Sequence, residues 1–160
     1  MSNTDSASEA RNNQMLFRDV QAPLEARVED LLERLTLEEK CLLCHGRVSK
    51  DEDEKFFAGG IARLGIPPIA FCDGPIGVRQ IKASEPTTGM PCTLSLSCTW
   101  DAEAVRAYAT VLAEEVLAIG RHGLLAPGVN MMRTPLCGRN FEYFGEDPLL
   151  VSQFGVHYIR

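Results

Sequence analysis

The chain has 160 residues, of which 45% are hydrophobic and 24% charged, and its formal net charge is −6. This composition is typical of a soluble globular protein and excludes disordered and fibrous classes. The negative charge, without any Lys/Arg cluster, argues against nucleic acid or anionic lipid as a partner, and no apolar stretch has the length of a bilayer span. We therefore expect no nucleic-acid partner and no membrane partner.

Residues 1–24 are expected to form a polar, poorly ordered leader. They contain neither the basic start nor the apolar segment of a secretory signal, so we expect a cytoplasmic protein. In that compartment the six cysteines would be free, mostly buried thiols rather than disulfides.

Two helices are predicted next. Apolar residues recur with helical spacing over 25–35, which predicts a helix with one buried stripe. The stripe consists of Val28, Leu31, Leu32 and Leu35. Thr36 and Glu39 form a capping box, which predicts a second helix running to Gly46. The charged segment 47–55 is predicted to be an exposed connector.

Three segments are predicted to be strands: 68–72, 92–98 and 123–127. Residues 92–98, CTLSLSC, alternate apolar and hydroxyl side chains with a period of two, which is typical of a strand.

Two more helices separate or follow these strands. Asp101 is placed to cap a helix over 102–119, which Gly120 ends. The apolar face of that helix comprises Val105, Tyr108, Leu112, Val116 and Ile119. Asp147 and Pro148 predict the start of a last helix, because Asp favours the N-cap and Pro the first helical position.

Alternating strands and helices predict an α/β fold built on a parallel sheet or barrel. Three strands cannot close a barrel, and a complete (β/α)8 domain takes about 250 residues. Either the chain is a small open sheet or it stops part-way through a larger domain. The last helix, which has no stop signal before Arg160, favours the second interpretation.

Residues 41–45, CLLCH, match the C-x-x-C-H pattern of covalent haem c, which raises the hypothesis of a redox or haem protein. Attachment of haem c requires export and an axial partner, and neither is indicated. The capping box places both cysteines in an amphipathic helix instead. A zinc site would need a second ligand pair, whereas His122 and His157 are isolated in the sequence. We expect no metal and no cofactor.

FCDGPIGVR, residues 71–79, places Asp73 directly after a buried strand and before a stiff Gly-Pro turn. In βα architectures, polar residues at the C-terminal ends of strands line the functional face. Asp73 can therefore serve a ligand, or it can simply cap the turn, and the local sequence leaves both open. Arg79 is interpreted as structural.

RTPLCGRNFEYFGEDP, residues 133–148, also follows a predicted strand. A guanidinium offers planar donors that suit carboxylates or adjacent sugar hydroxyls, and aromatic side chains can stack on a sugar ring. The alternative is an ion-pair cluster that ties the loop down, and both can hold at once. That cluster would comprise Arg133, Arg139, Glu142, Glu146 and Asp147. No phosphate-binding glycine loop and no serine in a nucleophile elbow occurs.

DGPIGVR and NMMRTPLCGRNFEYFGEDP together resemble the N-terminal part of glycoside hydrolase family 3, the β-glucosidase and β-xylosidase group. RVEDLLERLTLEEKCLLCHG, GGIARLGIPPIAFCDGP and the segment from Pro91 to Asp101 fit the same pattern, so the resemblance covers about residues 25–160. It implies an α/β fold that is an incomplete TIM-like (β/α)8 barrel, N-terminal portion only. Residues 25–160 would then be a truncated barrel domain, in which the two cysteines of CLLCH are ordinary helix residues.

The resemblance implies retaining hydrolysis of terminal non-reducing β-D-glycosyl residues through a covalent glycosyl-aspartate intermediate. Asp73 would accept hydrogen bonds from hydroxyls of the non-reducing sugar, and Arg139 would donate to neighbouring hydroxyls of the same ring. Arg133, Glu142 and Asp147 would support the loop. The partner is then a carbohydrate, a β-glucoside or β-xyloside; no oligomeric state is assigned.

The resemblance also places the family's Lys-His pair, aspartate nucleophile and acid/base carboxylate C-terminal to the matched region. We therefore expect no catalytic residue in this chain. Retaining hydrolysis needs two carboxyls about 5 to 5.5 Å apart, but neither Asp73 nor Glu142 does covalent chemistry in the family pattern. The expectation is a β-glucosidase fragment that is inactive alone; the alternative is a non-catalytic sugar-binding or structural fragment.

Overall fold

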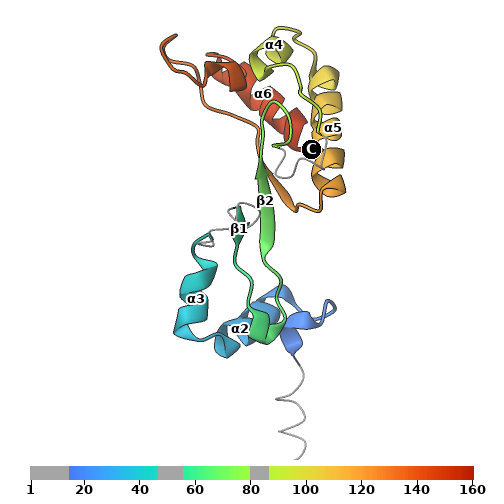
Figure 1. Cartoon of the computed structure of the whole chain (residues 1–160). Coiled ribbons are helices and arrows are strands. Elements are labelled where there is room, and N and C mark those ends of the chain that lie inside the picture. The colour runs from blue at the N-terminus through green and yellow to red at the C-terminus, as the bar shows by residue number, and fades with distance from the viewer. Residues whose placement is uncertain (1–14, 47–55, 80–86) are drawn as a thin grey trace, which may run out of the picture. The chain divides into compact units, whose positions relative to one another are not determined.

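The computed structural model describes residues 15–46, 56–79 and 87–160, whose elements are labelled in Figure 1. They belong to two compact units, and the boundary along the chain lies between His45 and Gly46. Among these residues, no helix is both long and apolar enough to cross a membrane. The predicted connector 47–55 lies outside the described residues, as do residues 1–14 of the predicted leader.

The first unit contains a 3-10 turn, η1 (Leu16–Arg18), and the helices α2 (Leu24–Arg34) and α3 (Leu37–Leu43). The predicted capping box of α3 is confirmed. The Thr36 hydroxyl accepts from the Glu39 amide at 3.2 Å, and the Glu39 carboxylate accepts from the Thr36 amide at 3.0 Å. The helix ends earlier than Gly46, because the chain tightens into an i→i+3 bond from the Cys44 amide to the Cys41 carbonyl.

The apolar stripe of α2 is only partly buried, so that prediction is half wrong. Leu35 is buried, whereas Val28 and Leu32 are each 47% exposed. The polar side of the helix instead holds η1, since the Asp30 carboxylate accepts from the Phe17 amide at 3.0 Å. Side-chain bonding to a backbone amide thus orders a part of the expected leader.

The second unit is built on a three-stranded sheet in the order β1-β2-β3. Its strands are β1 (Phe57–Ala58), β2 (Ile69–Asp73) and β3 (Gly123–Leu125). β1 and β2 are antiparallel, whereas β2 and β3 are parallel and pair Phe71 with Gly123 and Asp73 with Leu125. The parallel pair confirms the predicted α/β alternation. β1 was not predicted, because two residues are too short to show a periodic pattern.

The predicted strand at 92–98 is wrong, because this segment forms the helix α4 (Thr93–Ser97). Its buried residues are Thr93, Leu96 and Ser97, whose i, i+3 and i+4 spacing is that of one helical face and not of a strand. Buried hydroxyls also need partners inside the protein, and Ser97 donates to the Leu94 carbonyl at 2.8 Å. That bond within one turn is available to a helix but not to a strand.

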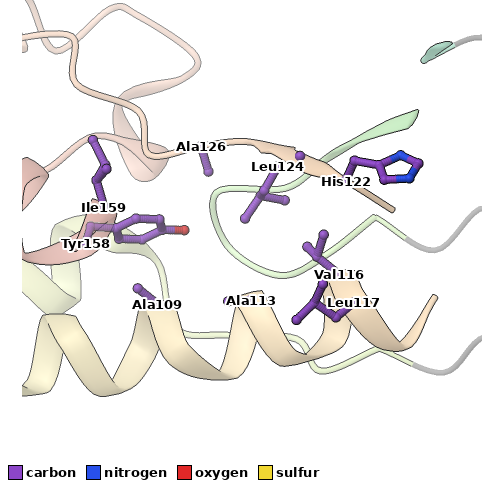
Figure 2. Close-up of a pocket in the computed structure, with 10 residues that line it drawn as sticks. Ala109, Ala113, Val116, Leu117, His122, Leu124, Ala126, Tyr158 and Ile159 are labelled. Carbon is purple, nitrogen blue, oxygen red and sulfur yellow. The ribbon is translucent and has the colours of Figure 1, made fainter. Parts of the chain in front are cut away.

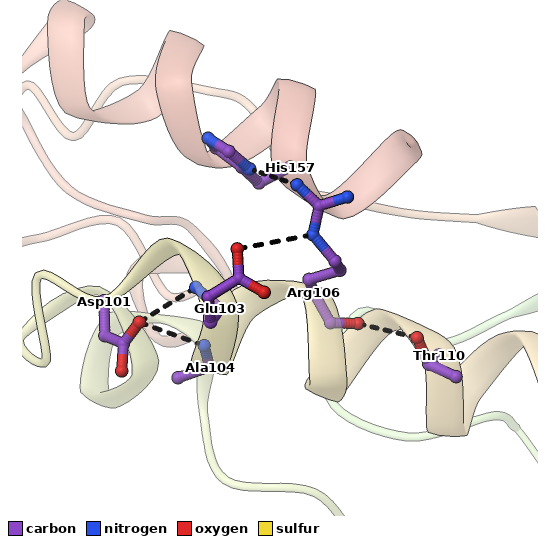
Figure 3. Close-up of polar contacts among 6 residues, drawn as sticks. All are labelled: Asp101, Glu103, Ala104, Arg106, Thr110 and His157. Carbon is purple, nitrogen blue, oxygen red and sulfur yellow. Dashed lines mark hydrogen bonds and ion pairs between the residues drawn. The ribbon is translucent and has the colours of Figure 1, made fainter.

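The helices α5 (Ala102–Ala118) and α6 (Pro148–Ile159) pack against each other and begin at the predicted caps. Asp101 accepts from the amides of Glu103 and Ala104 at 2.9 and 3.3 Å (Figure 3). Asp147 caps α6 in the same way. Arg106 of α5 reaches across to the Nδ1 atom of His157 on α6 at 3.0 Å.

The core of this unit lies between β2, α5 and α6. It contains the predicted face of α5, in which Val105 and Leu112 are fully buried, together with Phe144. The hydroxyl of Tyr108 lies 3.0 and 2.9 Å from the carbonyl oxygens of Pro75 and Pro91, which share its one proton. Burial raises the pKa of Tyr108 to about 12, which keeps this donor protonated.

The six cysteines are free thiols, but the prediction that most of them are buried is wrong. Only Cys72 is buried, and Cys92 is half-buried. Four are exposed: Cys41, Cys44, Cys98 and Cys137. Aliphatic neighbours in sequence do not bury a thiol that lies on the outer side of a short helix or in a loop.

Candidate sugar-binding site

Asp73 is the last residue of β2, at the edge of the sheet where the parallel strands end. Its side chain is half-buried, and within the described chain its carboxylate makes no hydrogen bond or ion pair. The alternative in which Asp73 caps the following turn is therefore not realised. The carboxylate is free to accept hydrogen bonds from a ligand.

The turn after Asp73 is held by backbone rather than by the carboxylate. Gly74 has a φ of +138°, and a Cβ there would lie 1.8 Å from the Gly77 carbonyl oxygen. The Arg79 amide donates to the Asp73 carbonyl at 2.7 Å, which closes the turn. The Arg79 side chain is exposed and lies 5.8 Å from the centre of the Phe56 ring. This cation–π contact agrees with the structural interpretation of Arg79.

Arg139 and Glu142 form an ion pair at the 3-10 turn η4 (Asn140–Glu142). The Glu142 side chain is only 9% exposed, whereas the Arg139 side chain is 69% exposed. The buried carboxylate therefore holds a guanidinium that remains accessible to solvent. The hydrogen bond to Glu142 is the main cause that raises the pKa of Arg139, and the charge of Asp73 adds a smaller contribution. Asp73 and Arg139, far apart in sequence, thus lie within electrostatic reach of each other.

The other predicted support residues act separately. Asp147 accepts from the amides of Leu149 and Leu150 at 2.7 and 3.0 Å, so it caps α6. Arg133 is exposed. Of the five charges in the predicted ion-pair cluster, all of which are described, only Arg139 and Glu142 form an ion pair. The cluster is otherwise wrong, because Asp147 is already committed to a helix terminus.

Asn140 has a role in this loop that was not predicted, and two of the loop's aromatic residues do not have the predicted role. The Asn140 amide donates to the Thr134 carbonyl at 2.8 Å, which braces the loop before Arg139, and no pattern predicted it. Tyr143 and Phe144 are buried, so they build the core and do not stack on a ligand. Phe141, 45% exposed, is the one aromatic of the segment left at the surface.

A cavity of about 350 Å³ lies elsewhere, between α5, β3 and the end of α6 (Figure 2). The small side chains of Ala109 and Ala113 leave the space, and Leu124 and Tyr158 line it. His122 lines it too, but its Nδ1 atom accepts from the Ala70 amide at 2.9 Å and so fastens the sheet. The walls of the cavity are mostly apolar and contain neither of the two proposed sugar-binding residues, so it does not suit a hydroxyl-rich ligand.

The sequence model of the Glycosyl hydrolase family 3 N terminal domain matches residues 52–160, more than half of the chain. The chain belongs to glycosyl hydrolase family 3. The family assignment made from the DGPIGVR and GRNFEYFGEDP segments is thereby confirmed.

Curated relatives of this family member are β-glucosidases. The thermostable beta-glucosidase B of Acetivibrio thermocellus is 39% identical over 142 residues, which cover 83% of this chain and 18% of the relative. A beta-glucosidase of Bacteroides ovatus is 39% identical over 155 residues, covering 91% of this chain and 20% of the relative. The chain thus spans about a fifth of the length of these relatives.

Solved structures of similar proteins match the fold. Beta-glucosidase 3B of Thermotoga neapolitana, in complex with alpha-D-glucose, gives a TM-score of 0.73 at 33% identity over 83% of this chain and 21% of that one. A beta-glucosidase of Paenibacillus barengoltzii gives 0.74 at 30% identity over 100% of this chain and 19% of that one. The predicted fold class is confirmed: this family 3 chain is the N-terminal portion of a TIM-like barrel.

Proposed function

We propose that this chain forms part of the sugar-binding site of a retaining β-glycosidase, one that acts on terminal non-reducing β-D-glucosyl residues. The observation that carries the proposal is the unpaired carboxylate of Asp73 within electrostatic reach of the Arg139 guanidinium. A carboxylate accepts and a guanidinium donates, and together they complement adjacent hydroxyls of a pyranose. The family membership supports a sugar as the ligand.

The relatives support the same ligand class. Solved structures of the Thermotoga neapolitana protein are described in complex with glucose and in complex with glycerol, both of which carry adjacent hydroxyls. In this chain, Asp73 would accept from one hydroxyl and Arg139 would donate to its neighbour. Buried Glu142 would hold the guanidinium in place without touching the sugar.

With this geometry the chain would bind a sugar but would not cleave a glycosidic bond. Retaining hydrolysis needs a nucleophile and an acid on two carboxyls about 5 to 5.5 Å apart. Glu142 is buried and committed to Arg139, so it is a poor partner for Asp73 in that chemistry. We propose that both reacting carboxyls belong to the part of the enzyme that this fifth of the length does not span.

Calorimetric titration of the chain with glucose tests the binding role. Saturable binding should weaken at least tenfold in Asp73→Ala and in Arg139→Ala, while Arg79→Ala should leave the affinity within about twofold. Unchanged affinity in Asp73→Ala would contradict the proposal.

An assay of turnover with a chromogenic β-glucoside tests the proposal that this chain does not cleave its ligand. The chain alone should give no turnover above the buffer rate. Robust hydrolysis that survives purification would show that the reacting carboxyls lie within these residues, and Asp73 and Glu142 would then have to be reconsidered.

A further inference from the structure

Trp100 has a backbone conformation that L-residues rarely adopt. Its φ is +54°, the one positive value among the non-glycine residues that the structure describes. This conformation costs free energy for any residue with a bulky side chain, whereas glycine adopts it freely. Trp100 is 75% exposed, so core packing does not offset the cost. A strained position with an exposed aromatic side chain indicates a function for that side chain.

The indole lines a cavity of about 440 Å³ between α4 and the segment that leads into α6. Leu94, Met132 and Leu150 supply apolar surface in the same cavity, and Glu146 supplies a carboxylate. An aromatic plane with apolar walls and a few polar groups is the usual composition of a small-molecule site.

Of the two carboxylates that line this cavity, one is available to a ligand. Glu146 is exposed and makes no hydrogen bond or ion pair in the described part of the chain. Asp147 lines the cavity too, but its carboxylate already accepts from two amides of α6. Glu146 is therefore the acceptor that remains free.

A second cavity, of about 340 Å³, shares Leu94, Met132 and Glu146 with the first. Its lining adds Arg133 and Asn140. The side-chain oxygen of Asn140 is buried and has no hydrogen-bond partner. A buried acceptor without a donor is destabilising, and a ligand hydroxyl or a bridging water would satisfy it.

We propose that these two adjoining cavities form a second carbohydrate site, which binds a neutral β-linked oligosaccharide. Trp100 stacks on the apolar C–H face of one pyranose ring, while Glu146 accepts and Arg133 donates hydrogen bonds at the hydroxyl rim. The free carboxylate disfavours phosphorylated or acidic ligands. Neither Asp73 nor Arg139 lines either cavity, so the inference goes beyond the proposed function.

Trp100 is the single tryptophan of the chain, so intrinsic fluorescence reports on this site alone. Titration of the whole chain with cellotriose should give a saturable blue shift and at least a twofold drop in acrylamide quenching. Asp73→Ala should retain both changes, although it loses the binding assigned to the first site. No saturable change in the wild type, or a change that Asp73→Ala abolishes, would overturn the inference. A shift that depends on protein concentration without sugar would also overturn it, since the indole would then contact another copy.

Substitution of Trp100 separates binding from folding. Trp100→Gly suits the positive φ, so its melting temperature should equal or exceed that of its parent. In an Asp73→Ala background, which removes the first site, Trp100→Gly should lower the calorimetric affinity for cellotriose at least tenfold. Trp100→Phe should keep part of the affinity. Glu146→Gln should weaken binding several-fold, whereas Glu103→Gln, at an exposed position on α5, should not. A lower melting temperature or unchanged affinity in Trp100→Gly would assign the indole to packing.

Discussion

Asp73 owes its position to residues that have no chemistry of their own. It ends β2, and the turn that follows depends on Gly74, whose φ of +138° and close approach to the Gly77 carbonyl exclude a side chain. The carboxylate is left free because the backbone closes the turn without it. Glu142 has the opposite role: it is buried, and it serves the site by holding Arg139.

At Gly74 we expect Gly74→Ala to lower the free energy of unfolding by at least about 2 kcal/mol, because the new Cβ would meet backbone and the conformation would be strained. Urea unfolding followed by circular dichroism measures the change. Gly138→Ala is the matched control, since a Cβ added there would have no atom within 4 Å and the φ of Gly138 is not positive. Equal stability of both variants would show that the Gly74 turn can open without cost.

The helices were predicted well because their signals are local. A capping box, two Asp N-caps and a terminal glycine each act within one turn, so they mean the same in the isolated sequence and in the fold. The segment 92–98 failed for the opposite reason. Its apolar and hydroxyl residues alternate in the sequence as in a strand, but the three that are buried in this fold, Thr93, Leu96 and Ser97, lie on one face of a helix, and the Ser97 hydroxyl bonds within that helix.

For α5 we expect Tyr108→Phe to lower the free energy of unfolding by about 1–3 kcal/mol, because the Pro75 and Pro91 carbonyls lose the hydroxyl proton that they share. Tyr158→Phe is the control on the adjacent helix: its hydroxyl is buried without a partner, so its removal should be neutral or slightly stabilising. Thermal or urea unfolding of the two variants should rank them in this order. The reverse order would mean that the hydroxyl of Tyr108 is not the tie between α5 and the chain around Pro75 and Pro91.

The contact between η1 and α2 should depend on pH. The pKa of Asp30 is lowered from its ordinary value of 3.8, chiefly by its hydrogen bond with Arg34. Because the folded pKa is the lower one, the ionised carboxylate stabilises the contact above pH 3.8, and this stabilisation is lost as the pH falls through the folded pKa. Amide hydrogen exchange of Phe17 measured between pH 2 and pH 6 should, after correction for the intrinsic rate, show reduced protection at the acid end (roughly below pH 4). Asp30→Asn should remove the dependence.

For the whole molecule, the parallel pairing of β2 with β3 is the step that assembles the proposed site. It brings the end of β2, with Asp73, to the same edge as the loop that follows β3 and carries Arg139. No local pattern encodes that proximity. It follows from the register of the two strands, which is specified by the strand face that is buried in the core.

A double-mutant cycle tests the assembly. We expect Asp73→Asn and Arg139→Lys each to weaken glucose binding by several-fold, and the double variant to lose less than the sum of the two. The coupling should be about 0.5–3 kcal/mol, as for residues that contact one ligand together. Calorimetry on the four proteins measures it, and strictly additive losses would place the two side chains on different ligands or surfaces.

The sequence by itself determined the family, the α/β class, the caps of α3, α5 and α6, and the two residues proposed to hold a sugar, because these depend on residue identity and spacing along the chain. Only the tertiary structure decided which loop charges pair, that Tyr143 and Phe144 belong to the core, and that 92–98 is helical. It also decided that Trp100 is exposed in a left-handed conformation beside Glu146. Burial and pairing depend on residues that are distant in sequence, and a one-dimensional pattern does not record which of them meet.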